Sequence, residues 1–272
     1  MDDRLDNILD RVDQLKLFPA AAQRIMALCQ RDDAELKDLA LAVASDPVLT
    51  ARLLQAANSP FYGLPKRVAT VPRAVQLLGM EGTRSIAFAQ AVNALSMQAG
   101  PRARSLYDHA MASGAVMLQL APRLDGVHPP LMFATALVHD LGLQLLFLLD
   151  PEATERRLDT FGHGPRFAKE EREALGFDHA QLGAAGLRRW GLPEEQAVLV
   201  ETHHSPMGRQ QRSRVLMQIA DAMADGVIEG EEADQLAARG RNHPLSPLLS
   251  APPTAFEAAA QDLGNTWRAL AS

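Results

Sequence analysis

Cysteine is almost absent from this chain of 272 residues, in which Cys29 is the only one. A single cysteine can form neither a disulfide within the chain nor a zinc site built from cysteines. The first residues, MDDRLDNILDRVDQLKLF, are acidic and have no long apolar core, which excludes an ordinary signal peptide. We therefore expect a protein of a reducing compartment, the cytoplasm.

Aromatic residues and excess positive charge are also scarce: Phe, Trp and Tyr make up 5% of the chain, and its formal net charge is −6. Proteins that bind nucleic acid commonly combine a basic surface with stacking aromatic rings. Local basic groups occur in PKRVATVPR and GRQQRSR, and we interpret them as solvated loops or helix ends. Neither nucleic acid nor an anionic membrane is expected as a partner.

Long apolar runs are missing too, with one exception at residues 131–149. This run approaches the length of a membrane span, but it carries His139, Asp140, Gly142 and Gln144 near its centre. A central aspartate costs about 2.5 to 3.5 kcal/mol on membrane-insertion scales. The run therefore predicts a buried helix of a soluble protein and no membrane span.

Helical periodicity dominates the rest of the chain. No segment combines β-branched residues, strict alternation and hairpin turns, so we predict an all-α protein. At residues 3–15, Leu5, Ile8, Leu9 and Val12 form one apolar stripe at helical spacing. The further predicted helices cover about 19–30, 34–45, 47–58, 70–79, 81–97, 104–121, 130–149, 178–190, 193–204, 212–225, 230–239 and 254–270.

Residues that cap or interrupt helices define several of these predicted helix ends. Asp46 is placed to cap a helix that has Pro47 at its first position, and Gly79 stops the helix that begins near Pro72. Gly100 and Pro101 mark the best boundary between two helical halves. The predicted parts are 1–100, an N-terminal helical half; 101–226, a half with most of the reactive side chains; and 227–272, an extension that docks on the core or on a partner.

Asp140 is the only formally charged residue between Leu131 and Leu149. A buried carboxylate without compensation shifts its pKa, finds a partner or binds a metal. On a helix, His139 and Asp140 point about 100° apart, so both reach one ion only if it lies between their directions. The His139–Asp140 pair alone is therefore weak evidence for a metal site.

Histidines and carboxylates recur in the second half of the chain. Taken singly, His109 is typical of a hydrogen-bonded core residue, His203 and His204 suit the C-terminus of a helix, and Asp221 shares a solvated row with Asp225. Taken together, imidazoles and carboxylates suit iron, manganese, nickel or zinc, and a helical core can bring distant ones together. The candidate ligands of one or two divalent ions are His109, His139, Asp140, His179, His203, His204 and Asp221.

The order of these residues resembles the HD superfamily of metal-dependent phosphohydrolases. The first half, with DPVLTARLLQAANSPFYG and AVQLLG, looks like the HDOD family, the HD-related output domains of bacterial signalling proteins. ALVHDLGLQLL, FDHAQLGAAGLRRWGLP and THHSP continue the likeness, which covers about residues 15 to 225. It implies an all-α, HDOD-type helical bundle with an N-terminal helical half and an HD-like half.

Two departures separate the chain from active relatives of the cyclic-dinucleotide phosphodiesterase type. Those relatives usually read HD-x-G-K, whereas Leu143 stands at the lysine position. No GYP motif follows, and only His163 in TFGHGPRF is vaguely similar. The resemblance therefore implies a stand-alone regulatory output module that binds a signalling protein or a small signal molecule, with a degenerate HD site that could still bind metal.

The alternative is a metal-dependent phosphohydrolase acting on a cyclic dinucleotide or a nucleotide. His109, His139, Asp140 and Asp221 would then hold one ion, while His179, His203 and His204 would help to hold a second. In an active enzyme Asp140 would be the catalytic residue. Arg209, Arg212 or Arg214, just beyond the histidine pair, would replace the missing lysine as a phosphate clamp.

Overall fold

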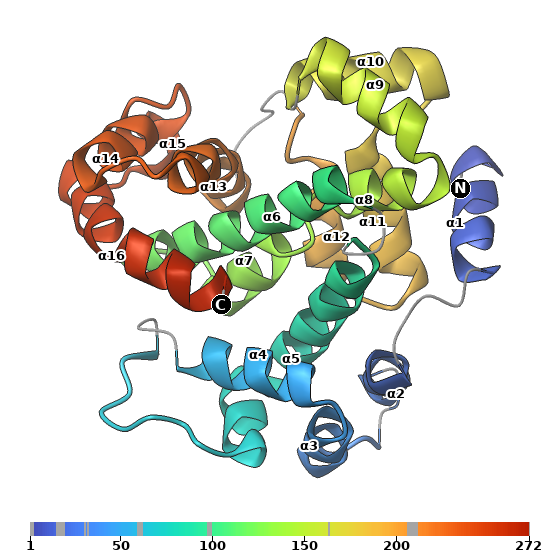
Figure 1. Ribbon diagram of the computed structural model, residues 1–272. Helices are drawn as coiled ribbons and strands as arrows, with labels where there is room; N and C mark the ends of the chain where they lie inside the picture. The colour runs from blue at the N-terminus through green and yellow to red at the C-terminus, as the bar shows by residue number, and fades with distance from the viewer. Residues whose placement is uncertain are drawn as a thin grey trace.

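The described part of the chain is helical, without strands (Figure 1). The computed structural model describes residues 3–14, 20–29, 31, 33–58, 62–96, 100–162, 164–205 and 212–271. The predicted all-α class is confirmed. The division into 1–100, 101–226 and 227–272 remains a prediction, although one continuous apolar core includes side chains from all three ranges.

The N-terminal half contains α1 (Asp3–Gln14), α2 (Ala20–Cys29), α3 (Leu36–Ala44), α4 (Pro47–Ala57) and α5 (Val71–Ser96). The Asp46 side chain accepts hydrogen bonds from the backbone N–H groups of Val48 and Leu49, both at 2.9 Å, which confirms the predicted cap. Gly79 has φ of 70° and ψ of −176°, so α5 is two helical segments joined at a kink. The predicted stop at Gly79 is thus confirmed.

Replacing Asp46 with alanine is expected to lower the free energy of unfolding by about 1 kcal/mol, because two N–H groups at the start of α4 lose their acceptor. Urea denaturation followed by circular dichroism measures the loss. Glu155→Ala is the matched control, since this exposed residue lies inside α9. Equal losses in the two variants would contradict the capping role.

The second half is built around α6 (Pro101–Leu120), which packs against α7, α13 and α16. A short 3-10 turn, Ala121–Arg123, follows it. The other helices here are α7 (Pro129–Ala136), α8 (Leu141–Leu149), α9 (Pro151–Phe161), α10 (Pro165–Leu175), α11 (His179–Arg189), α12 (Glu194–Glu201) and α13 (Arg212–Glu229).

The single helix predicted over 130–149 is wrong. The chain turns at residues 137–140, between α7 and α8, and His139 Nδ1 donates to the carbonyl of Ala136 at 2.8 Å. The sequence does not reveal this break, because both helices and the turn are buried and are therefore mostly apolar. Leu131–Leu149 is the one described stretch long and apolar enough to cross a membrane, and 94% of it is buried inside the fold.

Two further limits differ from prediction. The helix predicted to reach residue 204 ends at Glu201, and His203 and His204 lie in the turn that follows. No helix was predicted between 150 and 177, where α9 and α10 form a hairpin against α8 and α11. The sequence does contain helix-start and helix-stop residues here, because Pro151 and Pro165 open the two helices and Gly176 ends the second.

The C-terminal extension contains α14 (Ala233–Arg241), α15 (Ser246–Leu249) and α16 (Pro253–Ala271). It docks on the core: α16 packs along α6, and Gln119 Nε2 donates to Thr266 Oγ1 at 2.7 Å. At the end of α16, the carbonyl of Leu270 accepts from Arg52 of α4 at 2.7 Å. The sequence left open whether this segment packs on the core or on a partner, and the contacts of α16 with α6 and α4 show that it packs on the core.

Candidate metal centre

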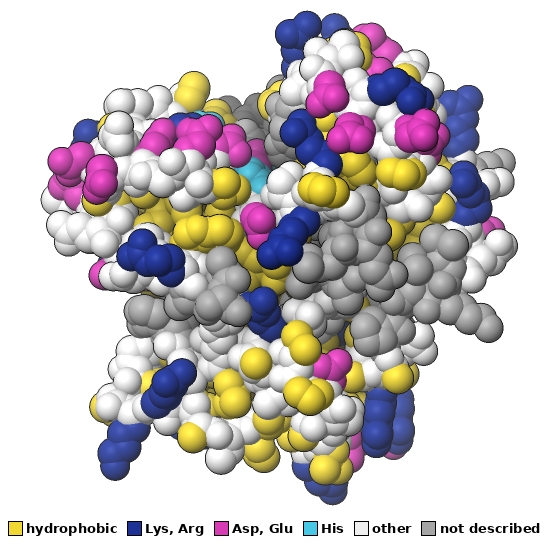
Figure 2. Space-filling view, viewed as in Figure 1, with side chains coloured by type: hydrophobic (Ala, Val, Ile, Leu, Met, Phe, Trp, Pro, Cys, Tyr) yellow, Lys and Arg dark blue, Asp and Glu magenta, His cyan; other side chains and the backbone are white. Residues whose placement is uncertain are grey.

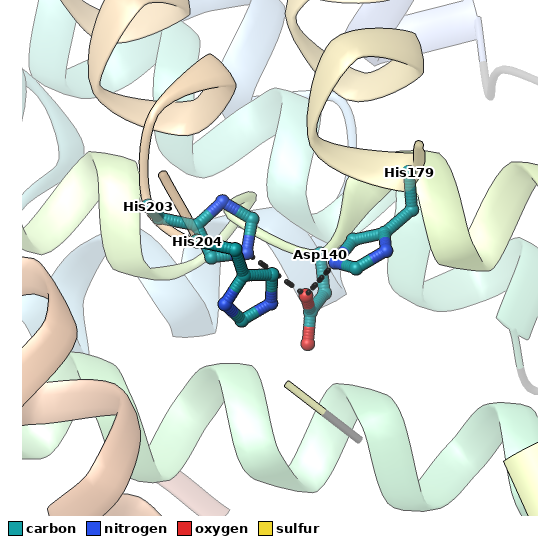
Figure 3. A group of neighbouring side chains, drawn as sticks. All are labelled: Asp140, His179, His203 and His204. Atoms are coloured by element: carbon teal, nitrogen blue, oxygen red, sulfur yellow. Dashed lines mark ion pairs between the residues drawn. The ribbon is translucent and has the colours of Figure 1, made fainter. Parts of the chain in front are cut away.

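The candidate ligands predicted from sequence meet in the second half of the protein. Their ligand atoms form two groups, within each of which all atoms lie within 4.8 Å of one another. One group is Asp140, His179, His203 and His204 (Figure 3), and the other is His109, His139 and Asp221. The residues come from α6, the α7–α8 turn, the start of α11, the turn after α12, and α13.

Both groups lie inside the protein. The side chains of His139, Asp140, His179 and His203 are 0% exposed, and Asp221 is the most open at 16%. On the face shown in Figure 2, histidine contributes only a small cyan area. A carboxylate such as Asp140 needs compensation by positive charge in this setting.

Local structure places His179 and the histidine pair. Asp178 caps α11 in a capping box with Gln181, which puts His179 at the first helical position. His203 follows the end of α12, and its Nδ1 donates to the carbonyl of Val200 at 2.6 Å. Asp140 occupies the N-cap position of α8, but its side chain makes no cap hydrogen bond there. Its carboxylate faces the histidines instead.

Acceptors at Nδ1 orient four of the histidine rings. His139 and His203 donate from Nδ1 to backbone carbonyls, and His179 donates from Nδ1 to the Glu171 carboxylate. His109 Nδ1 lies 3.2 Å from Asp225 Oδ1. A carbonyl can only accept, so Nδ1 of His139 and His203 carries the proton and Nε2 is the donor atom for a metal in the neutral ring.

The spacing between facing atoms fits shared coordination. His139 Nε2 lies 3.3 Å from both Asp140 Oδ2 and Asp221 Oδ1. Ligand atoms bound to one ion at about 2.0 to 2.2 Å are themselves about 2.8 to 3.6 Å apart at octahedral or tetrahedral angles. Within the described residues, His139 Nε2 makes no hydrogen bond despite this closeness. The residues therefore have the chemistry and spacing to hold a metal ion.

The two oxygens of Asp140 face different groups. Oδ2 faces His139, whereas Oδ1 lies 3.6 Å from Nε2 of both His179 and His203. Figure 3 shows this carboxylate between His179 on one side and the His203–His204 pair on the other. Asp140 would therefore help to hold a metal ion in either group.

The pKa shifts differ among the histidines. Burial opposes the charged form of His179, but the Glu171 carboxylate outweighs burial and raises the pKa of that ring. In the first group burial holds the pKa of His203 below its usual value, and burial together with the neighbouring imidazoles holds the pKa of His204 well below it. Both rings are therefore neutral near pH 7, as a metal ligand must be.

In the second group, burial opposes the charged form of His109, but hydrogen bonds to Asp221 and Asp225 outweigh it and raise its pKa to about 9. Burial likewise opposes charge on His139, whose pKa the negative charge of Asp140 raises well above normal. The hydrogen bond from His109 and the nearby charge of His139 hold the pKa of Asp221 well below its usual range despite its burial. A metal entering this group must displace protons.

The residues considered as a phosphate clamp, and the position of the missing lysine, lie in different surroundings. Leu143 is fully buried in an apolar cluster with Leu106, Phe147 and Phe167. Arg212 donates from Nη1 to the carbonyl of Asp125 at 2.7 Å. Arg214 lies on α13, the helix of Asp221, while Arg209 and His163 fall outside the described residues. The phosphate clamp remains a prediction.

The sequence did not reveal Glu171, nor that Asp225, an exposed residue as expected, lies beside His109. Glu171 is fully buried and accepts from the backbone N–H of His179 at 2.9 Å as well as from its Nδ1. The signal that could have found it is its position four residues after Phe167, on the apolar face of α10.

Fold and site together define an all-helical protein with a paired histidine–aspartate centre in its core. The family model of the HDOD domain matches residues 15–206, and the chain belongs to this family. Asp221 lies beyond the matched range.

Solved structures share the fold. An HDOD domain protein of unknown function from Geobacter sulfurreducens has a TM-score of 0.66 and 21% identity, covering 99% of this chain and 97% of that one. A protein from Shewanella amazonensis SB2B, provisionally called a metal-dependent phosphohydrolase, has a TM-score of 0.63 and 19% identity, covering 98% and 100%. At these identities the likeness extends to the fold alone.

Among curated proteins, an uncharacterized protein of Treponema pallidum (strain Nichols) is 24% identical over 236 residues. The alignment covers 83% of this chain but only 45% of the relative's length.

Proposed function

We propose that the protein is a signal-transduction output module, in which a buried His/Asp centre holds one or two divalent transition metal ions, and which acts by binding a signalling protein or a small signal molecule. The observation that carries the proposal is the convergence of the whole predicted ligand set, with Asp140 facing both groups. Iron, manganese, nickel and zinc all suit such a donor set.

The chain's own residues suit a regulatory role for this centre. The ligands belong to α6, α11, α13 and two turns, so their mutual positions depend on how these elements pack. Asp140 joins the two groups, and the Nδ1 acceptors fix the ring orientations. Metal binding is therefore linked to the arrangement of the helical core, whose surface a partner can sense.

Leu143 argues for signalling rather than hydrolysis. Its side chain is 0% exposed among apolar neighbours, where a lysine ammonium would lose its hydration without gaining a partner. The position that usually carries lysine in active relatives therefore contributes packing and no charge toward a phosphate.

Metal content tests the proposal. Natively purified protein, analysed by inductively coupled plasma mass spectrometry, is expected to contain one or two equivalents of a transition metal. His139→Ala and Asp140→Ala should lose at least one equivalent, because each removes a buried ligand atom. His128→Ala is the control, since His128 is exposed and belongs to neither group. A wild-type protein that takes up no metal even after reconstitution would rule the proposal out.

The second candidate is a metal-dependent phosphohydrolase, favoured by the placement of Asp140 between two groups of ligands. A bound divalent ion would supply positive charge and Lewis acidity toward a phosphate. Metal-loaded protein should be assayed with cyclic dinucleotides and nucleotides, with Asp140→Asn for comparison. Turnover that Asp140→Asn abolishes would establish the enzyme in place of the regulatory module, whereas bound metal without turnover supports the module.

A further inference from the structure

The α9–α10 hairpin brings a buried carboxylate to the metal centre from outside the ligand set. Glu171 lies on α10 with a side chain that is 0% exposed, and it belongs to neither ligand group. Its Oε2 accepts from the backbone N–H of His179 at 2.9 Å and from His179 Nδ1. One carboxylate oxygen therefore holds both the main chain and the ring of this ligand.

Phe167, one helical turn earlier on α10, packs on the same ring. Its ring centroid lies 5.8 Å from that of His179, and its side chain is fully buried. The ring of His179 is thus limited by an aromatic surface and fixed at Nδ1 by a carboxylate. In this orientation His179 Nε2 lies 3.6 Å from Asp140 Oδ1.

The group that accepts the Nδ1 proton differs between His179 and two of the other candidate ligands. His139 and His203 are oriented by backbone carbonyls, which no side-chain substitution removes. His179 depends instead on a side chain that carries a negative charge. Buried carboxylates are costly unless they are compensated, so a fully buried glutamate at this position calls for a reason beyond packing.

We propose that Glu171 is a positioning residue of the metal centre: it fixes the Nδ1–H tautomer of His179, aims Nε2 at the ion beside Asp140, and strengthens this ligand by its negative charge. The inference rests on the proposed metal binding. Carboxylates that accept the second ring proton of a ligating histidine raise metal affinity, and their removal typically lowers it by about 10- to 100-fold. We expect a loss of this size here.

The test compares Glu171→Gln with the wild-type protein. Glutamine keeps the size of the side chain and one acceptor oxygen but removes the charge. Zn²⁺ affinity is measured by competition with a chelating dye, and Co²⁺-loaded protein gives a visible absorption spectrum that reports ligand geometry. We expect an affinity about 10- to 100-fold weaker and an altered Co²⁺ spectrum. Melting in chelator, without metal, shows whether the variant is folded.

The matched control is Glu173→Gln, on the same helix. The Glu173 side chain is 70% exposed and lies 3.7 Å from Lys169, so its loss should leave Zn²⁺ affinity unchanged. Glu171→Asp should recover part of the affinity, because it restores a charged acceptor with a shorter reach. This rescue would not occur if Glu171 only filled space.

The outcomes separate the two proposals. If wild-type protein binds neither Zn²⁺ nor Co²⁺, the proposed metal centre itself fails. If wild type binds both and Glu171→Gln matches it in affinity and spectrum, the metal centre stands and the role of Glu171 is wrong. If Glu171→Gln fails to fold, Glu171→Met takes its place, because methionine has a similar length but neither a charge nor an acceptor oxygen for His179. Wild-type affinity and spectrum in that variant would overturn the inference.

Discussion

Removing the metal with a chelator is expected to lower the melting temperature by about 10 °C. Without an ion, Asp140 stays buried among imidazoles that compensate its charge only in part. The pKa of His139 is raised, whereas His203 and His204 are neutral near pH 7. A ligand present at about 1,000 times its dissociation constant stabilises the folded state by about 4 kcal/mol. In domains of about 150 to 250 residues, each kcal/mol shifts the melting temperature by about 2 to 4 °C.

Differential scanning calorimetry before and after treatment with EDTA measures this shift. His139→Ala serves as the control, because its melting temperature should respond much less to the chelator once one ligand group is broken. Re-addition of the metal should restore the melting temperature of the wild type. A wild-type protein that loses its metal and melts at an unchanged temperature would show that the ion contributes nothing to the stability of the core.

Gly142→Ala is expected to cost about 3 kcal/mol or more of unfolding free energy and to displace the metal ligands. A Cβ at Gly142 would lie 1.9 Å from the carbonyl oxygen of His179 and 2.7 Å from the backbone N of Gly183. Both are main-chain atoms, so no side-chain rotation relieves the overlap. Helix α11 would have to move away from α8, and it would carry His179 away from Asp140.

Urea denaturation and metal content together test this prediction. Gly264→Ala is the matched control, because this glycine also lies in a helix and its Cβ would meet nothing closer than Arg268 at 3.8 Å. That substitution should leave stability unchanged or raise it by up to about 1 kcal/mol, since alanine favours the helix. A Gly142→Ala protein with wild-type stability and metal content would mean that the approach of α8 and α11 is not essential to the site.

Much of the architecture could be predicted from sequence because its signals are local. The stripe of Leu5, Ile8 and Leu9, the Asp46 cap and the kink at Gly79 each depend on a few neighbouring residues, and each has its counterpart in the structure. The candidate ligands could also be named, because the order of these histidines and aspartates along the chain resembles that of the HD superfamily.

What escaped prediction depends on packing between distant segments. The turn at 137–140 is hidden by uniform burial, which removes the amphipathic periodicity that marks helix ends. Glu171 stands between Glu170 and Arg172 in a charged segment, and apart from its spacing from Phe167 it is the contact of α10 with α11 that distinguishes it from these less buried neighbours. For Asp225, proximity to His109 is likewise visible only once α6 and α13 are placed side by side.

Helix α16 also connects the two helical halves of the protein. Because α16 lies along α6, through Gln119 and Thr266, and holds α4 through Arg52 and the carbonyl of Leu270, it works as a clasp across both halves. Lifting α16 would uncover the side of α6 that it covers and break the contact between Arg52 and Leu270, while α4 would keep its packing against α5. Helix α16 is therefore a place from which a pull or a competing helix would act on α6, the helix that carries His109.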